Sequence, residues 1–203
     1  MLELDPPRTR PADAPPDAAE TTADDDAALV ALAVRDRRAF APLYARYAER
    51  VFRYSSRRLG SREAAEDATS VVFTKALAAL PAFRGGSFGA WLFAIAHNVV
   101  VNATRRRPDL PLDAIAERED PSAGGLPEES ALAAEERRVL RAMLAVLPDD
   151  QRRVVELRLA GLTGAEIAEA LGRSVASVKM LQLRALRRMR AAGDQEMVEG
   201  DDR

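Results

Sequence analysis

The chain has 203 residues, of which 47% are hydrophobic and 31% charged, enough for two small domains or one medium one. It contains no cysteine and one histidine, His97, which excludes disulfides, thiol nucleophiles and clusters of histidine or thiolate metal ligands. The net charge of −2 hides a strong segregation, because the successive blocks 1–26, 27–108, 109–135, 136–190 and 191–203 carry −6, +9, −7, +6 and −4.

This charge segregation points to a polyanionic partner. Two basic blocks alternate with three acidic ones, which is typical of two nucleic-acid-binding modules held by acidic connectors. An ordinary charged surface is the alternative explanation. Ala, Leu and Arg dominate while aromatic residues make up only 5%, so we predict an all-α fold of two small helical domains.

Three segments contain too few apolar residues to form a packed core. Residues 1–23 are rich in Pro, Asp and Ala, and we expect a disordered acidic extension there. Residues 108–130 are interrupted by Pro and Gly and are predicted to form a flexible acidic linker, and 193–203 a short acidic tail. No apolar run approaches the roughly 20 residues that cross a bilayer, and the N-terminus is unlike a signal peptide. We therefore expect a cytoplasmic protein without membrane insertion.

Four helices are predicted in the first ordered region, 24–107. Asp25 or Asp26 is expected to cap the first, which runs through Arg35. The second is predicted over 40–59, ended by Gly60. Its apolar residues recur at spacings of three and four, so we expect a buried face made of Phe40, Leu43, Tyr44, Tyr47, Val51 and Tyr54.

The third helix is predicted from a Ser61 cap to Leu80, where Pro81 stops it. Its expected inward face consists of Ala65, Ala68, Val72 and Ala76. Its outer half consists of Asp67, Ser70, Phe73, Thr74 and Leu77. Partly exposed Phe73 and Leu77 beside an acidic residue indicate a protein-binding face. A helix buried on two sides of the bundle would explain the same spacing.

The fourth helix is predicted from a Ser87 cap to about Arg106. Its expected core face is Phe88, Leu92, Ile95, Val99 and Ala103, and we expect His97 at the surface. An adjoining strip of one aromatic, two amides and one cation suits single-stranded DNA, and consists of Trp91, Asn98, Asn102 and Arg105. The loop before the helix adds Phe83 and Arg84 among glycines, and the helix end adds Arg106 to the same set. Trp91 in the core is the alternative.

The second ordered region, 131–192, is predicted to hold helices over 131–147, 149–160, 163–171 and 174–191. Thr163 and Glu166 have the spacing of a capping box. Gly172 permits the left-handed residue of a tight turn, and Ser174 can cap the next helix. This arrangement is typical of a DNA-binding helix-turn-helix; an amphipathic helical hairpin with a solvated arginine face is the alternative.

The final helix has two faces at 100° per residue. The apolar face consists of Val178, Leu181, Ala185 and Met189, with Gln182 beside it. Ser174 begins the opposite face, on which the candidates for reading base edges are Arg173, Ala176, Ser177, Met180 and Arg184. The candidates for phosphate contacts are Lys179, Arg187, Arg188 and Arg190.

These segments together resemble one family, the extracytoplasmic-function (ECF) sigma factors of the sigma-70 family. AEDATSVVFTKAL, at 65–77, is similar to the family's polymerase-binding helix. FRGGSFGAWLFAIAHNVVVNATRRR, at 83–107, is similar to its −10 recognition segment, and LPDDQRRVVELRLAGLTGAEIAEALGRSVASVK, at 147–179, to its −35 helix-turn-helix. The likeness covers about 27–107 and 131–190, in the family's order.

The resemblance implies a two-domain sigma factor that is not an enzyme and needs no cofactor or metal. Its third helix would dock on the β′ clamp helices of core RNA polymerase through Glu66, Asp67, Ser70, Phe73, Thr74 and Leu77. Phe83, Arg84 and Asn98 would help to capture an unpaired −10 base. The C-terminal domain would read the −35 element and rest on the polymerase β flap. Promoter DNA is the implied ligand, and an anti-sigma factor is an expected further partner.

The sequence departs from the family pattern at several positions. Ser70 and Val71 stand where Gln and Glu are usual, and Leu181 and Leu186 where arginines are usual. A stand-alone helix-turn-helix regulator would explain 149–190 equally well but leaves the 83–107 segment without a role. An adaptor that only binds polymerase would leave the arginine-rich recognition face unused. No phosphate-binding glycine loop or nucleophile–base pair favours an enzyme.

Overall fold

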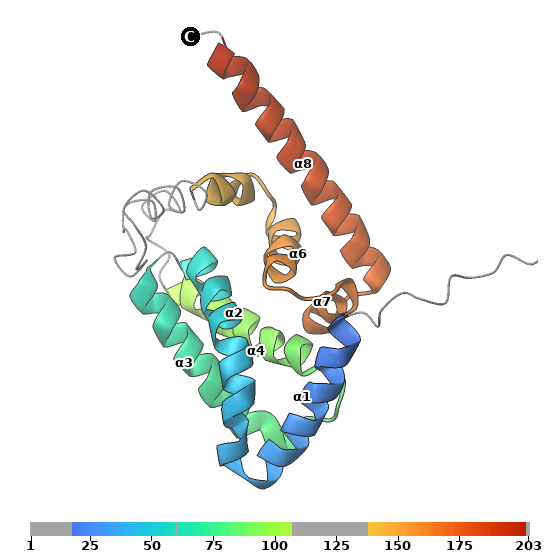
Figure 1. The fold of residues 1–203 in the computed structure, drawn as a ribbon. Coiled ribbons are helices and arrows are strands. Elements are labelled where there is room, and N and C mark those ends of the chain that lie inside the picture. Colours follow the sequence, from blue (N-terminus) through green and yellow to red (C-terminus); the bar gives the residue numbers. More distant parts are fainter. Residues whose placement is uncertain (1–17, 60, 107–137, 202–203) are drawn as a thin grey trace, which may run out of the picture.

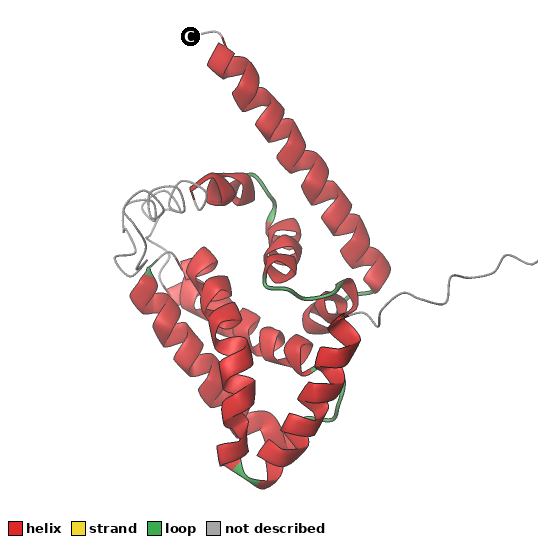
Figure 2. Cartoon of the chain, viewed as in Figure 1, coloured by secondary structure: helices red, strands yellow, loops and turns green. Residues whose placement is uncertain are grey.

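The computed structural model describes residues 18–59, 61–106 and 138–201, and these residues are helical apart from short turns (Figure 2). The N-terminal elements are α1 (Ala18–Arg35), η1 (Arg37–Phe40), α2 (Ala41–Leu59), α3 (Arg62–Ala79), η2 (Leu80–Ala82) and α4 (Phe88–Arg106). The C-terminal elements are a helix at 138–145, α6 (Asp149–Leu159), α7 (Gly164–Leu171) and α8 (Val175–Asp201). The predicted all-α class is confirmed for the described part, whereas Gly60 and the predicted linker lie outside it.

The N-terminal unit is a bundle in which α2, α3 and α4 pack on one another and α1 crosses beside α2 and α4 (Figure 1). Two of its helices start where the sequence places a cap. Ser61 Oγ accepts from Ala64 N–H at 3.1 Å, and Ser87 Oγ accepts from Ala90 N–H at 3.1 Å. Each bond satisfies a backbone donor that the first turn of a helix leaves free.

The C-terminal unit consists of the 138–145 helix and α6 to α8. Helices α6 and α7 both pack on the first half of α8, and Ala185 of α8 is buried together with Leu144 and Leu147. Arg152 fastens the turn between the first two helices, because its guanidinium donates to the carbonyl oxygens of Leu144, Ala145 and Leu147 at 3.0–3.2 Å. Those carbonyls lie in the last turn of the 138–145 helix and just after it, where the helix itself supplies few donors.

The two units share one continuous core. Helix α7 packs against α4, and α6 against α2, as the ribbon shows (Figure 1). Side chains of α6 and α7, such as Val154, Leu157 and Ile167, belong to the same buried cluster as Tyr54 and Phe93 of the N-terminal bundle. The two helical units therefore lie directly against each other.

Helix α1 begins earlier than predicted, so its expected cap is wrong. The helix starts at Ala18, within the expected disordered extension, whose first part, 1–17, lies outside the described residues. Asp26 lies inside the helix with only 3% of its surface exposed. Its carboxylate accepts a hydrogen bond from the Tyr47 hydroxyl and pairs with Arg46, so it joins α1 to α2 rather than starting a helix.

Two aromatic residues of the bundle differ from the prediction. Tyr44 is 49% exposed although it was expected in the buried face of α2. Phe73 is buried, 6% exposed, although it was expected on the outer half of α3. The two rings lie 4.7 Å apart, so Tyr44 covers Phe73 from the solvent side. The predicted inward face of α3, by contrast, is confirmed: Ala65, Ala68, Val72 and Ala76 are all buried.

The buried face of α4 was predicted at the wrong position around the helix axis. Phe88 and Leu92 are buried as expected, but Ile95, Val99 and Ala103 are only half-buried. The fully buried positions that the prediction missed are Ala90, Phe93, Ala96 and Val100. Helix α4 packs on α2 and α3 with one side and on α7 with another, so its apolar residues surround much of its circumference.

Helix α8 continues ten residues beyond its predicted end at Ala191, through Asp201, into the expected acidic tail. Its predicted apolar face is confirmed, with Val178 and Ala185 fully buried and Leu181 and Met189 half-buried against the core. Gln182 is half-buried, which places it at the rim of that face.

Candidate nucleic-acid and protein interfaces

The helix-turn-helix forms as the sequence predicts. Thr163 Oγ1 accepts from Glu166 N–H at 3.2 Å, and Glu166 Oε2 accepts from Thr163 N–H at 2.8 Å, which completes the capping box of α7. Gly172 ends that helix with φ of 61°, in the left-handed region. Ser174 Oγ then accepts from Ser177 N–H at 3.2 Å and starts α8. These local bonds fix the direction in which α8 leaves the turn.

The predicted reading face of α8 is available to a large ligand. Ser177 is half-buried, and the exposed members of the predicted set are Arg173, Ser174, Ala176, Lys179, Met180, Arg184, Arg187 and Arg188. Arg173 is held in place, because one of its guanidinium nitrogens lies 2.8 Å from a carboxylate oxygen of Asp150 on α6. A helix with exposed cations and small polar residues on one face can enter a DNA major groove and contact phosphates on both sides.

The residues around α4 that were predicted to bind single-stranded DNA fall into an exposed group and a packed group. Asn98, Asn102 and Arg105 are exposed along α4, and Arg84 is exposed in the preceding loop. Trp91 is half-buried instead, in the core-side position that was the alternative, and its ring centroid lies 5.2 Å from Phe83 and 5.6 Å from Phe88. The side chain of Arg106 lies outside the described residues.

The loop before α4 turns sharply at two glycines. Gly85 and Gly86 have φ of 93° and 90°, a region that other residues rarely adopt. The turn brings Phe83 against both Phe88 and Trp91, with the Phe83 and Phe88 ring centroids 6.3 Å apart. The result is a small aromatic cluster beside a turn without side chains; the space at Gly85 is open, whereas the Glu169 carboxylate of α7 lies close to Gly86.

A groove of about 820 Å³ runs between α2 and α3, over η1. Its lining includes four aromatic residues, Phe40, Tyr44, Phe52 and Phe73, together with polar and charged ones. Of the predicted polymerase-binding set, the groove brings together Glu66, Ser70, Phe73, Thr74 and Leu77, whereas Asp67 is exposed outside it. The sequence reading missed the α2 side of this groove, although the exposed Tyr44 lies one turn from Phe40 in an otherwise regular apolar pattern.

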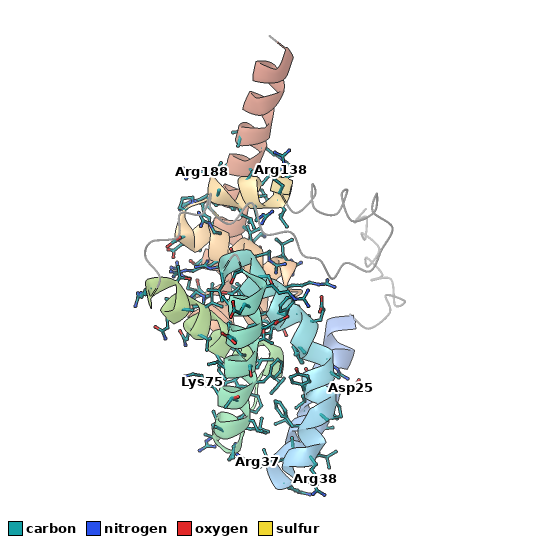
Figure 3. The ribbon with its side chains drawn as sticks, turned by 90° about the vertical axis from the view of Figure 1, so that its left-hand side faces the viewer. Asp25, Arg37, Arg38, Lys75, Arg138 and Arg188 are labelled. Carbon is teal, nitrogen blue, oxygen red and sulfur yellow. The ribbon has the colours of Figure 1, made fainter. Side chains whose placement is uncertain are left out.

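The groove and the reading face occupy different parts of the molecule. Arg37 and Arg38, which border the groove, lie near one end of the molecule, and Arg188 on α8 lies near the other (Figure 3). A protein bound in the groove and DNA bound along α8 would therefore not compete for the same surface.

A cluster of charged residues that the sequence did not predict lies between α2 and α6. Arg58 Nη1 is 2.9 Å from Glu156 Oε2, and the two side chains are 10% and 1% exposed. Burial raises the pKa of Glu156, and Arg58 opposes that rise. Arg50 donates from Nε to the Ala160 carbonyl oxygen at 2.8 Å. The sequence gives no local signal for these bonds, because the paired residues are about a hundred positions apart.

His97 belongs to this cluster and is not the surface residue that was predicted. Its Nδ1 lies 3.1 Å from the hydroxyl oxygen of Tyr54, a fully buried residue, and the two form a hydrogen bond. Burial, followed by the nearby charges of Arg153 and Arg58, lowers the pKa of His97 to about 4. His97 is therefore neutral at neutral pH.

We expect this histidine to make the fold acid-sensitive. The folded pKa of about 4 lies below the unfolded value of 6.5, so the stability from neutral His97 is complete above pH 6.5. It is lost as the pH falls from 6.5 towards 4, because the unfolded chain takes up a proton that the folded chain does not. Thermal melts of the wild type and of His97→Gln at pH 7.5 and 5 measure this effect. The decrease in Tm on acidification should be smaller in the variant, and equal decreases would contradict the assignment.

Neither a metal site nor a membrane span is found in the part of the chain that the structure describes. Within it, no group of three or more His, Cys, Asp or Glu side chains could hold a metal ion. None of the helices there is long and apolar enough to cross a bilayer.

Comparison with known proteins connects both interfaces to one family. Residues 43–108 match the family model of sigma-70 region 2, and residues 137–189 match that of sigma-70 region 4. The first match contains most of the groove and the α4 strip, and the second contains the helix-turn-helix.

Individual relatives agree. The ECF RNA polymerase sigma factor SigD of Mycobacterium tuberculosis is 33% identical over 183 residues, which is 83% of this chain and 85% of SigD. The ECF RNA polymerase sigma factor BldN of Streptomyces coelicolor is 35% identical over 155 residues, 73% of this chain and 58% of BldN. A solved structure of CnrH in complex with the cytosolic domain of CnrY aligns with a TM-score of 0.63 at 25% identity, over 82% of this chain and 96% of CnrH. The chain therefore belongs to the ECF RNA polymerase sigma factors of the sigma-70 family.

Proposed function

We propose that this chain binds core RNA polymerase and directs it to the promoters of a particular regulon, where it takes part in −10 melting and transcription initiation. The observation that carries the proposal is the combination of an aromatic groove on the region 2 unit with an exposed, cation-rich recognition helix on the region 4 unit. The family comprises initiation factors rather than enzymes, so the polymerase supplies the chemistry. The site of action would be the cytoplasm, where RNA polymerase works.

The groove between α2 and α3 is the proposed docking site for the β′ clamp helices. A partner helix laid into it would bury the half-exposed ring of Tyr44 together with Leu77, while Ser70, Thr74 and Glu66 would face its polar side. The region 4 unit would rest on the β flap. The exposed Leu186 of α8, which lies beside the reading face, fits a protein surface there.

Promoter DNA would be read at two places. The exposed face of α8 would enter the major groove of the −35 element, with Arg173, Met180 and Arg184 near base edges and Arg187 and Arg188 at phosphates. The loop at 83–87, together with the exposed Asn98 and Asn102, would hold an unpaired base of the −10 element. We call the turn formed by Gly85, Gly86 and Ser87 the −10 turn.

An anti-sigma factor is a further proposed partner. The CnrH structure, which this chain resembles along most of its length, contains CnrH together with the cytosolic domain of CnrY. A regulatory protein of this kind could use the aromatic groove.

Reconstituted transcription tests the proposal. Purified chain, core RNA polymerase and a library of promoter fragments should give transcripts from discrete start sites only when the chain is present. The aligned upstream DNA would then define the −10 and −35 elements. The competing function, a stand-alone regulator, requires duplex binding without polymerase and no chain-dependent initiation, and that result would replace the proposal.

A further inference from the structure

The exposed side of α8 carries a line of apolar residues among its cations. Ala176, Met180 and Leu183 are all exposed and follow one another at spacings of four and three residues. These spacings place the three side chains one above another on a helix with about 3.6 residues per turn. Met180 is 48% exposed and Leu183 41%, so both are open to a partner. We call Ala176, Met180 and Leu183 the apolar strip.

Cations lie on both sides of the apolar strip. At about 100° per residue, Lys179 and Arg190 fall on one side of it and Arg184 and Arg188 on the other, and all four are exposed. A protein partner would need two acidic rows with an apolar line between them. The major groove of DNA always has such rows, because a phosphate backbone borders it on each side. The arrangement of charges therefore favours duplex DNA as the occupant.

The position of the apolar strip along α8 also fits a groove. Helix α8 begins at Val175, so Leu183 is its ninth residue and lies within about 14 Å of the helix start. Residues near the start of a recognition helix are those that reach base edges. Met180 and Leu183 are separated by about 4.5 Å along the helix axis, close to the roughly 3.4 Å between successive base pairs. The two side chains can therefore lie over neighbouring base pairs.

Duplex DNA offers an apolar side chain one favourable target. The −10 turn would hold an unpaired base, whereas α8 would meet paired bases, which expose only their edges. In the major groove these edges carry hydrogen-bond donors and acceptors, and thymine adds the methyl group at C5. Leu183 has no hydrogen-bonding group, so it would leave a donor or acceptor unpaired, at a cost in affinity. Contact with a thymine methyl has no such cost.

We propose that Met180 and Leu183 determine part of the −35 specificity by contacting the methyl groups of thymines at two neighbouring base pairs. The inference rests on the proposed function, which places α8 in the major groove of the −35 element. It adds Leu183 to the residues that were predicted to read base edges. Arg184, beside the apolar strip, suits guanine, so one helix face would combine guanine and thymine recognition.

The test begins with selection of −35 sequences. The full-length chain with core RNA polymerase, the chain alone and core polymerase alone are each mixed with promoter fragments randomised through the −35 element, and the bound fragments are sequenced. We expect thymines, on either strand, at two neighbouring −35 positions. Each of these thymines is then replaced by deoxyuridine, which lacks only the C5 methyl and keeps the same hydrogen-bonding edge.

Each deoxyuridine should weaken binding of the wild type about fourfold, the effect of burying one methyl-sized group. In Leu183→Ala the ratio of affinities for thymine and deoxyuridine should fall close to one at one of the two positions. In Met180→Ala it should fall close to one at the other position. Both changes put alanine, the best helix former, at an exposed helical position, so folding is preserved.

The ratio is measured within each variant, so any change in polymerase binding cancels. Leu159→Ala is the matched control, because it is a leucine-to-alanine change at a 47% exposed position on α6. It should keep the wild-type ratio at both positions.

Three results would overturn the inference: selected −35 elements without neighbouring thymines, equal binding of thymine and deoxyuridine by the wild type, or a wild-type ratio in both Leu183→Ala and Met180→Ala. Weaker polymerase binding by Leu183→Ala with an unchanged ratio would assign the apolar strip to a protein instead. Failure of the proposed function is distinguishable, because the chain would then add nothing to selection by core polymerase. The ratios would in that case be measured on fragments that the chain selects alone, and no selection in either arm would overturn both proposals.

Discussion

Replacement of Phe93 by alanine is expected to destabilise the protein by about 3–5 kcal/mol, because it empties a fully enclosed site. The Phe93 ring has no exposed surface and lies edge-on to Tyr54, with ring centroids 5.8 Å apart. The guanidinium carbon of Arg50 lies 5.6 Å from the centroid of the same ring. The substitution removes all of these contacts, and Tm should fall by on the order of 10 °C for a chain of this size.

Thermal or urea unfolding, followed by circular dichroism at 222 nm, measures this effect. A matched pair of neighbours supplies the control, because Val99 is half-buried and Val100 is fully buried. Val100→Ala should cost clearly more than Val99→Ala, although both changes remove the same two methyl groups. The opposite order would show that α4 faces the core through Ile95 and Val99, as its sequence alone suggested.

The error about α4 has a physical origin. Hydrophobic periodicity identifies a buried face only when the rest of the helix is polar, and apolar residues surround most of α4. Ile95 and Val99 have the expected spacing, yet Phe93, Ala96 and Val100 have an equally regular one. Helix α4 packs on α2, α3 and α7, and the contact with α7 could not be anticipated when region 2 was treated as a separate domain.

Local signals, in contrast, were sufficient wherever the interacting groups are close in sequence. The caps at Ser61 and Ser87, the Thr163–Glu166 capping box and the left-handed Gly172 each depend on groups within four residues, and all four are confirmed. These features fix the helix starts and the turn of the helix-turn-helix. The candidate reading face of α8 could be predicted for the same reason.

Long-range polar pairs were the part that could not be predicted. Aspartate often caps the start of a helix, but the partners of Asp26, Arg46 and Tyr47, are about twenty residues away. From its sequence neighbours, several of which are arginines, Glu156 would be expected to lie in solvent, yet only 1% of its side chain is exposed. Burial of a charge is decided by a partner from another helix, and a single sequence does not reveal that partner.

Replacement of Tyr44 by alanine is expected to weaken the binding of core RNA polymerase at least about tenfold while it leaves the fold nearly intact. The Tyr44 ring is half exposed and forms one wall of the groove, 4.7 Å from Phe73. Aromatic side chains that become fully buried only in a complex contribute about 2 kcal/mol or more to binding. In the free protein this ring is already in contact with water, so removal of the ring should change Tm far less than Phe93→Ala does.

Binding of labelled core polymerase, measured by titration, and Tm together separate the two effects. Tyr44→Phe is the conservative control, since it keeps the ring over Phe73 and should bind nearly as the wild type does. Loss of affinity in Tyr44→Ala with an unchanged Tm would assign the groove to polymerase, because a folding defect would lower both values. Wild-type affinity in Tyr44→Ala would instead direct attention to the exposed Leu186 of α8, another apolar side chain that a polymerase subunit could cover.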